Sequence, residues 1–128
     1  IEKYKKFDIL ISASKPGAFS LNVIKNMRKP NIVFSLANPI SEISPEDAKT
    51  LKIDIFGTGR SDLPNQINNA VVFPGFLRAI LDFKIKKITL DMYVAASEGI
   101  AETIKNPTRD NIIPDAFNKD LVKNIKKA

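Results

Sequence analysis

The chain has 128 residues, 44% of them hydrophobic, which is enough for one domain with a modest core, and no apolar run approaches the roughly 20 residues that span a bilayer. It has no cysteine and no histidine, which excludes disulfides, thiolate metal sites and the commonest general base. The net charge is +6, and the excess of basic residues lies in residues 1–30 and 81–128, because residues 31–80 hold four basic and five acidic side chains. We therefore expect a soluble, cytoplasmic protein that binds neither membrane nor nucleic acid.

The first segments predict a strand followed by a helix. Residues 1–6 are lysine-rich, and we expect them to be the end of a helix that begins earlier in a longer protein. Residues 8–13 form a short apolar run closed by Ser14-Lys15-Pro16-Gly17, which is typical of a buried parallel strand. The following helix is expected to have Ser20 as its N-cap and to end before Pro30.

Two further strands flank a strong helix start. Residues 31–37 predict a strand that ends at Asn38-Pro39, because proline keeps the residue before it out of the helical region. Ser44-Pro45-Glu46-Asp47 then offers a cap, a proline at the first helical position and an acid three residues after the cap. About 15 residues separate this strand from the next, residues 53–56, which favours a crossover helix and parallel pairing over a hairpin.

Residues 57–76 form a long polar connection that is unlike the rest of the chain. Such a connection is costly to order unless it holds a site or packs on one. Its opening Gly57-Thr58-Gly59 is not a dinucleotide fingerprint, because a third glycine and an immediate helix are missing. We expect the next helix to begin near Pro74.

The remaining chain predicts helices. A helix is expected from about Thr89 until Asn106-Pro107, an extended segment at residues 111–114, and a short helix at residues 117–127. The fold class is therefore α/β: a partial Rossmann-like parallel sheet of about three strands with flanking and C-terminal helices. We expect a single domain, residues 1–128, with a βαβαβ-α part at 1–83 and C-terminal helices at 84–128.

The candidate site lies where the three strands end. Residues 12–17, Asn38-Pro39 and residues 57–62 should share the carboxyl edge of the sheet, where ligands bind in open parallel sheets. Asn38, Asn68 and Asn69 can each donate to a carboxylate and accept from a hydroxyl, which suits a hydroxy acid, but they cannot move protons. The alternative is that these asparagines, glycines and prolines only serve local turns.

Several motifs together resemble one family. They are Gly59 to Asn69 (Gly-Arg-Ser-Asp-Leu-Pro-Asn-Gln-Ile-Asn-Asn), Phe73-Pro74-Gly75, Ser14-Lys15-Pro16-Gly17, Leu36-Ala37-Asn38-Pro39 and Ile112-Ile113-Pro114. In this order they closely resemble the malic enzyme family in its bacterial and archaeal form. The resemblance covers essentially the whole chain and implies the C-terminal part of the NAD(P)-binding domain.

Members of this family oxidise L-malate with NAD or NADP and a divalent metal, Mg²⁺ or Mn²⁺, and decarboxylate the product to pyruvate and CO₂. The resemblance implies cofactor-binding roles for Ser14 and Asn38 and substrate-binding roles for Asn38, Asn68 and Asn69. The family's tyrosine acid, lysine base, metal-binding carboxylates and glycine-rich loop lie upstream of the matching part. No catalytic residue and no metal ligand is therefore assigned, and we predict that the isolated chain is inactive.

Two other interpretations remain open. The chain is alternatively a non-catalytic module that binds a dinucleotide or another ligand, or, less in keeping with its charge distribution, a basic nucleic-acid-binding domain. A three-stranded sheet also leaves an edge strand that can pair with another copy, so we expect a homo-oligomer.

Overall fold

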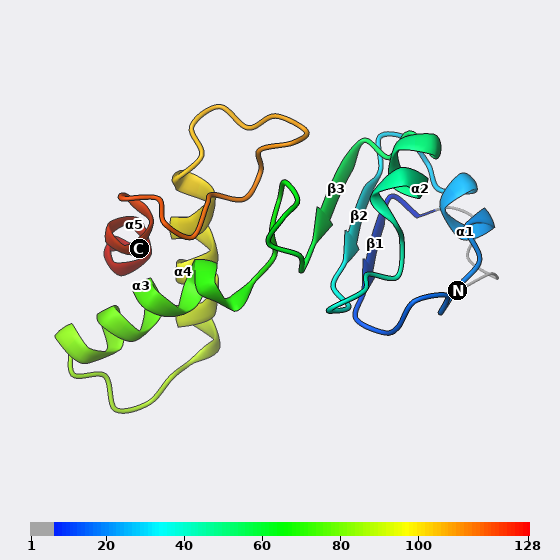
Figure 1. Ribbon diagram of the computed structural model, residues 1–128. Helices are drawn as coiled ribbons and strands as arrows, with labels where there is room; N and C mark the ends of the chain where they lie inside the picture. The colour runs from blue at the N-terminus through cyan, green and yellow to red at the C-terminus, as the bar shows by residue number, and fades with distance from the viewer. Residues whose placement is uncertain (1–6) are drawn as a thin grey trace. The chain divides into compact units, whose positions relative to one another are not determined.

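The computed structural model describes residues 7–128, which fall into two compact units that meet between Ile67 and Asn68 (Figure 1). The expected helix end at residues 1–6 lies outside the described residues. The sequence-based subdivision at residue 83 differs from this boundary, because the helix after the polar connection packs with the C-terminal helices. That the 128 residues act as a single domain stays a prediction.

Three parallel strands form the sheet of the first unit. They are β1 (Ile9–Ser12), β2 (Ile32–Ser35) and β3 (Ile55–Thr58), in the spatial order β1-β2-β3. The predicted parallel α/β sheet is thus confirmed. The third strand runs two residues later than predicted, so that Gly57 and Thr58 belong to the strand and not to the loop.

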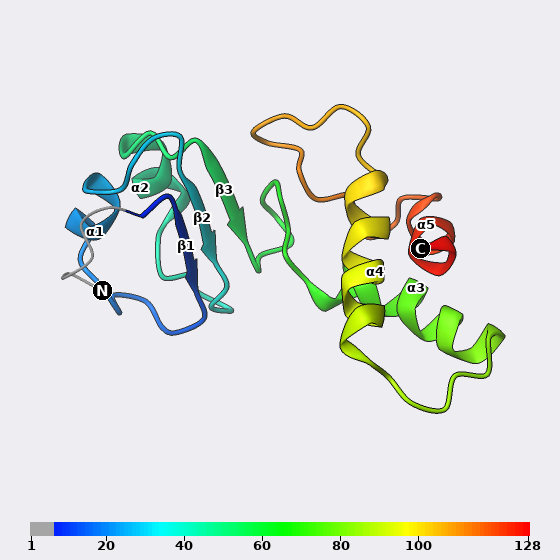
Figure 2. The ribbon, with the colours of Figure 1, turned by 180° about the vertical axis from the view of Figure 1, so that it is seen from behind.

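Two short helices cover one side of this sheet, as Figures 1 and 2 both show. The second, α2 (Pro45–Thr50), begins as predicted, with the Ser44 hydroxyl accepting a hydrogen bond from the Asp47 amide at 3.0 Å. The first, α1 (Asn22–Lys25), is shorter than expected and has Leu21 at its N-cap position. Ser20 instead accepts a hydrogen bond from the Asn22 amide at 3.2 Å. The core of the unit consists of Leu10, Ile24, Met27, Val33, Ile43, Ala48 and Ile53.

The opposite face of β1 remains exposed. Leu10 is buried, whereas Ile9 and Ile11 are 55% and 63% exposed. The prediction that this strand is buried therefore holds for only one of its faces. Parallel sheets are normally covered on both faces, whereas these two isoleucines remain exposed among the described residues.

The second unit consists of three helices: α3 (Asn69–Asp82), α4 (Leu90–Glu102) and α5 (Leu121–Lys127). The predicted helix start at about Thr89 is confirmed, because Thr89 is the N-cap residue of α4. In contrast, α3 begins at Asn69, so Pro74 lies inside the helix and not at its start. The C-terminal helix starts later than expected. Residues 111–114 form no strand, and nearby Thr108 and Asn111 make a single antiparallel bridge.

Ile125 of α5 fills the space beside the other two helices of this unit. It is 4% exposed and belongs to a core with Val71, Phe76, Ala96 and Leu121. A Cβ atom at Gly75 of α3 would lie 2.8 Å from the Cβ of Ile125, and one at Gly99 of α4 would lie 2.7 Å from its Cα. Both glycines therefore permit a close approach of the helices that any side chain would prevent.

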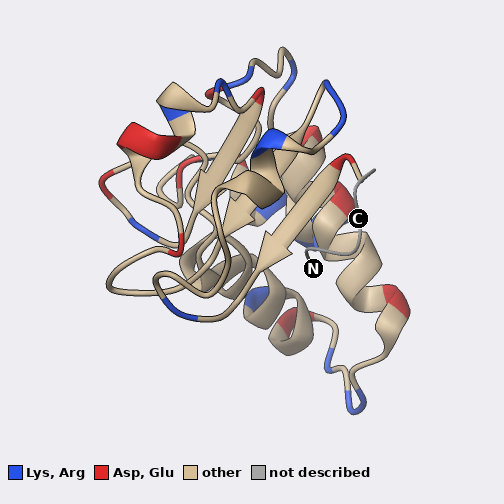
Figure 3. Ribbon diagram, turned by 90° about the vertical axis from the view of Figure 1, so that its right-hand side faces the viewer, with Lys and Arg blue, Asp and Glu red and all other residues tan. Residues whose placement is uncertain are grey.

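Charged residues of both signs are spread over the helices and loops, while the three strands contain none (Figure 3). The lack of charged residues in the strands is expected, because the strands contribute residues to the core of the first unit. None of the helices within residues 7–128 combines the length and the hydropathy that a membrane crossing requires.

Candidate functional site at the carboxyl edge of the sheet

The ends of the three strands lie in one row, as the parallel pairing requires. Ser12, Ser35 and Thr58 are aligned by the register of the sheet and are 8%, 0% and 0% exposed. The loops that follow β1 and β2 therefore leave the sheet side by side. These loops carry the predicted site residues Ser14 and Asn38.

A buried glutamate in the β2–α2 connection binds both loops. Glu42 is 7% exposed, and its Oε1 accepts hydrogen bonds from the Ser12 hydroxyl at 2.8 Å and the Ser14 amide at 2.7 Å. Its Oε2 accepts from the Ser35 hydroxyl at 2.7 Å and the Ala37 amide at 3.1 Å. One carboxylate thus fixes the ends of two strands and the first residues of two loops.

This environment keeps Glu42 ionised. Burial by itself disfavours the charged form, but the hydrogen bonds from the Ser35 hydroxyl and from the amides of Ser14 and Ala37 outweigh it and lower the pKa of Glu42 from 4.5 to about 2. A carboxylate with this pKa does not exchange protons near neutral pH. Its chemical role is that of a fixed anion and acceptor, not of a general acid or base.

Sequence reasoning did not single out Glu42. The available signal is weak: one acidic residue next to the buried Ile43, just before the cap of α2. Its hydrogen-bond partners Ser12 and Ser14 lie 30 and 28 residues away in sequence. No local pattern identifies such partners.

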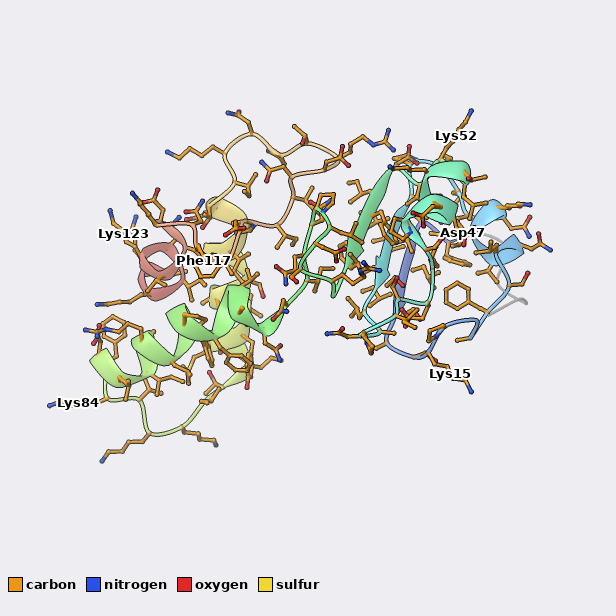
Figure 4. All side chains as sticks on the ribbon, viewed as in Figure 1. Lys15, Asp47, Lys52, Lys84, Phe117 and Lys123 are labelled. Carbon is orange, nitrogen blue, oxygen red and sulfur yellow. The ribbon has the colours of Figure 1, made fainter. Side chains whose placement is uncertain are left out.

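The predicted residues Ser14 and Asn38 belong to the two loops that this carboxylate binds. Both are exposed, and Asn38 directly follows Ala37, whose amide binds Glu42. The neighbouring Lys15 projects from the same loop away from the sheet (Figure 4). The backbone of both loops is thus fixed by hydrogen bonds to Glu42, while the Ser14 and Asn38 side chains remain exposed to solvent.

Asn68 and Asn69 belong to the second unit, at the start of α3. The side-chain oxygen of Asn68 accepts a hydrogen bond from the Ala70 amide at 2.9 Å, so this residue caps the helix, as the local-turn alternative proposed. Within the described part of the chain, its side-chain nitrogen makes no hydrogen bond. Capping therefore uses the oxygen of the amide and leaves its two donors for a ligand. Asn69 is the first residue of the helix and is exposed.

Much of the polar connection after β3 is ordered by its own contacts. The Ile67 amide donates to the Thr58 carbonyl at 2.8 Å, and the side chain of the buried Asn65 donates to the Phe56 carbonyl at 3.0 Å. A Cβ at Gly57 would lie 2.9 Å from the Ile67 side chain. Gly57 thus allows the returning loop to pack on β3.

The described residues offer polar groups but no metal cluster. Between residues 7 and 128 no group of three or more aspartates and glutamates is placed to hold a metal. Ser14 and Asn38 present an exposed hydroxyl and an exposed amide beside backbone that Glu42 holds in place, and such groups can form hydrogen bonds with a polar ligand.

Comparison with known proteins identifies the family of the chain. A family model described as the malic enzyme NAD-binding domain matches residues 1–125. The chain is 40% identical over 123 residues to the bifunctional malic/malolactic enzyme of Bacillus subtilis, which covers 94% of the chain and 30% of that enzyme. It is 36% identical over 116 residues to the NADP-dependent malic enzyme of Escherichia coli, covering 89% of the chain and 15% of that enzyme.

A solved structure agrees as well. The crystal structure of the malic enzyme from Pyrococcus horikoshii superimposes with a TM-score of 0.90 at 42% identity, over 96% of this chain and 29% of that one. The chain thus spans less than a third of the length of these relatives. The family match, the parallel sheet and the resemblance of the motifs agree, and the chain belongs to the malic enzyme NAD-binding domain family.

Proposed function

We propose that this chain serves an enzyme that oxidises L-malate with NAD or NADP and decarboxylates the product to pyruvate and CO₂. The observation that carries the proposal is the family match over residues 1–125, with Ser14 and Asn38 exposed beside a common buried carboxylate. Relatives that use NAD and relatives that use NADP are both similar to the chain. We further propose that the enzyme is cytoplasmic.

The candidate residues would bind and orient the reactants. Ser14 and Asn38 contact the cofactor, Asn38 also contacts the substrate, and Asn68 and Asn69 bind malate through their amide groups. Amide side chains hold a carboxylate and a hydroxyl in place but do not transfer protons. Proton transfer and the binding of Mg²⁺ or Mn²⁺ are assigned to none of these four residues.

The test of the proposed function is the reduction of NAD or NADP by the complete gene product in the presence of L-malate and Mn²⁺. Malate-dependent reduction that yields pyruvate is the expected result. A product that binds a nicotinamide nucleotide at micromolar concentration but turns over no malate would instead favour the non-catalytic module. A salt-dependent shift of a labelled oligonucleotide would favour the nucleic-acid-binding alternative.

Substitutions at Asn68 separate its capping role from the proposed malate contact. Asn68→Ser keeps a capping oxygen and removes both amide donors, so we expect an unchanged unfolding midpoint and a KM for malate raised by about tenfold, as loss of a hydrogen bond to a charged group implies. Asn68→Ala removes both functions and should in addition destabilise the protein by about 1 kcal/mol. A normal KM for malate in Asn68→Ser would refute the substrate contact.

The isolated 128-residue chain is expected to turn over no malate, because the family's tyrosine acid, lysine base and metal-binding carboxylates are assigned to none of its residues. The measurement is nicotinamide absorbance with malate, Mn²⁺ and either cofactor. The complete gene product at the same concentration is the positive control. Turnover by the isolated chain would show that it contains catalytic residues that we have not assigned.

We also propose that the chain self-associates through the sheet of its first unit. In the described sheet β1 is an edge strand, and it carries the exposed Ile9 and Ile11. Sedimentation velocity should show a concentration-dependent oligomer, and the double substitution of these two isoleucines by lysine should shift it toward monomer. A wild-type chain that sediments as a monomer at high concentration would contradict this proposal.

A further inference from the structure

We propose that Glu42 is a positioning residue, whose buried carboxylate holds the loops that carry Ser14 and Asn38 in the arrangement that receives cofactor and substrate. Its own side chain is buried, and its hydrogen bonds go to the two loops, so it is argued to act through these loops. The functional part of this inference rests on the proposed function. Its structural part, that one carboxylate fixes both loops, can be measured independently.

The geometry makes Glu42 the common contact of both loops. Each carboxylate oxygen accepts one serine hydroxyl from the end of a strand and one backbone amide from the loop that follows it. The serine hydroxyls hold the carboxylate in place relative to the ends of β1 and β2. The carboxylate in turn holds the backbone amides of Ser14 and Ala37 in the loops. The two loops are therefore fixed relative to the same carboxylate, although Ser14 and Ala37 are more than 20 residues apart in sequence.

Only an ionised carboxylate satisfies this arrangement. All four partners are neutral groups that donate to the carboxylate, two to each oxygen. A glutamine of the same size would present an NH₂ group to one serine hydroxyl and one backbone amide. The hydroxyl can turn and accept from the NH₂ group, but the backbone amide can only donate and loses its hydrogen bond. Glu42→Gln therefore removes the hydrogen bond to the Ser14 amide or to the Ala37 amide with almost no change in volume.

Glu42 is not a part of the hydrophobic core of its unit. The adjacent Ile43, which is 1% exposed, fills that core, whereas Glu42 lies at the carboxyl edge under two loops. A residue needed only for packing would have no reason to be charged, because burying a charge is costly unless its hydrogen bonds are satisfied. The contacts of Glu42 point to the loops as the parts that it serves.

Amide hydrogen exchange, measured by NMR on the 128-residue chain, tests the structural part. Three variants are compared: Glu42→Gln, Glu46→Gln as a control for loss of a charge at an exposed site, and Met27→Ala as a control for destabilisation of the same core. In Glu42→Gln the amide of Ser14 or Ala37 should exchange about tenfold or more faster, beyond any increase at Val33. Exchange that rises equally at all sites, as expected for Met27→Ala, or at none, overturns the proposal.

Kinetics of the complete gene product test the functional part. Glu42→Gln should raise the KM for the cofactor and lower kcat by about tenfold or more, because both loops move. Met27→Ala should leave both constants near the wild-type values at temperatures where it is folded. Wild-type kinetics in Glu42→Gln would overturn the proposal. A wild-type product that oxidises no malate would refute the proposed function, and the exchange measurement alone would then decide the role of Glu42.

Discussion

Substitution of Gly99 by alanine is expected to destabilise the helical unit by about 2–3 kcal/mol. In a helix interior, alanine is favoured over glycine by up to about 1 kcal/mol, so helix propensity alone predicts stabilisation. The added Cβ would, however, lie 2.7 Å from the Cα of Ile125 and 2.8 Å from the Asn124 carbonyl oxygen. Because these are backbone atoms, no rotamer change relieves the contact, and α4 and α5 must separate.

Two variants identify the cause of this effect. Ser97→Ala, at an exposed position of the same helix, should change the free energy of unfolding by less than about 0.5 kcal/mol. Ile125→Ala should not rescue Gly99→Ala, because the atoms nearest to the new Cβ remain in place. The measurement is urea unfolding followed by circular dichroism. An unchanged or higher stability of Gly99→Ala would show that the helices approach less closely than described.

The second large effect is the loss of stability in acid through Glu42. Because the folded-state pKa is about 2 and the ordinary value is 4.5, the ionised side chain contributes about 3 kcal/mol at neutral pH. The sign follows from proton binding. Below pH 4.5 the unfolded chain takes up a proton that the folded chain refuses, so the contribution is complete above 4.5 and is lost as the pH falls toward 2.

The comparison of wild type with Glu42→Gln isolates this contribution from that of the other carboxylates. The difference in free energy of unfolding between the two proteins should shrink by about 2 kcal/mol between about pH 6 and about pH 3. A pH-independent difference for Glu42→Gln would mean that Glu42 has an ordinary pKa in the folded chain.

Local sequence signals predicted the elements whose causes are local. The Ser44-Pro45 start of α2 was correct, because a capping signal involves residues within one turn. The start of α4 near Thr89 was also correct, because the helical spacing of apolar residues is itself a local pattern. The three strands were found because each is a short apolar run bounded by turn residues. The start of α3 was placed too late, because Pro74 resembles a first helical residue, whereas the capping oxygen of Asn68 lies six positions earlier.

For the candidate site, too, some features were predicted from the sequence and others were not. The motifs of the sequence by themselves determined the family and the loops in which Ser14, Asn38, Asn68 and Asn69 lie, and comparison with known proteins confirmed the family. The sequence did not reveal that Glu42 joins two of these loops, or that Gly75 and Gly99 lie against Ile125.

Only the tertiary structure decided those contacts. A hydrogen bond between residues 28 or 30 positions apart, and a helix approach that excludes one methyl group, depend on where the chain returns in space. Hydrophobic periodicity and capping signals depend on residues that are neighbours in sequence. They therefore do not predict contacts between residues that are distant in sequence.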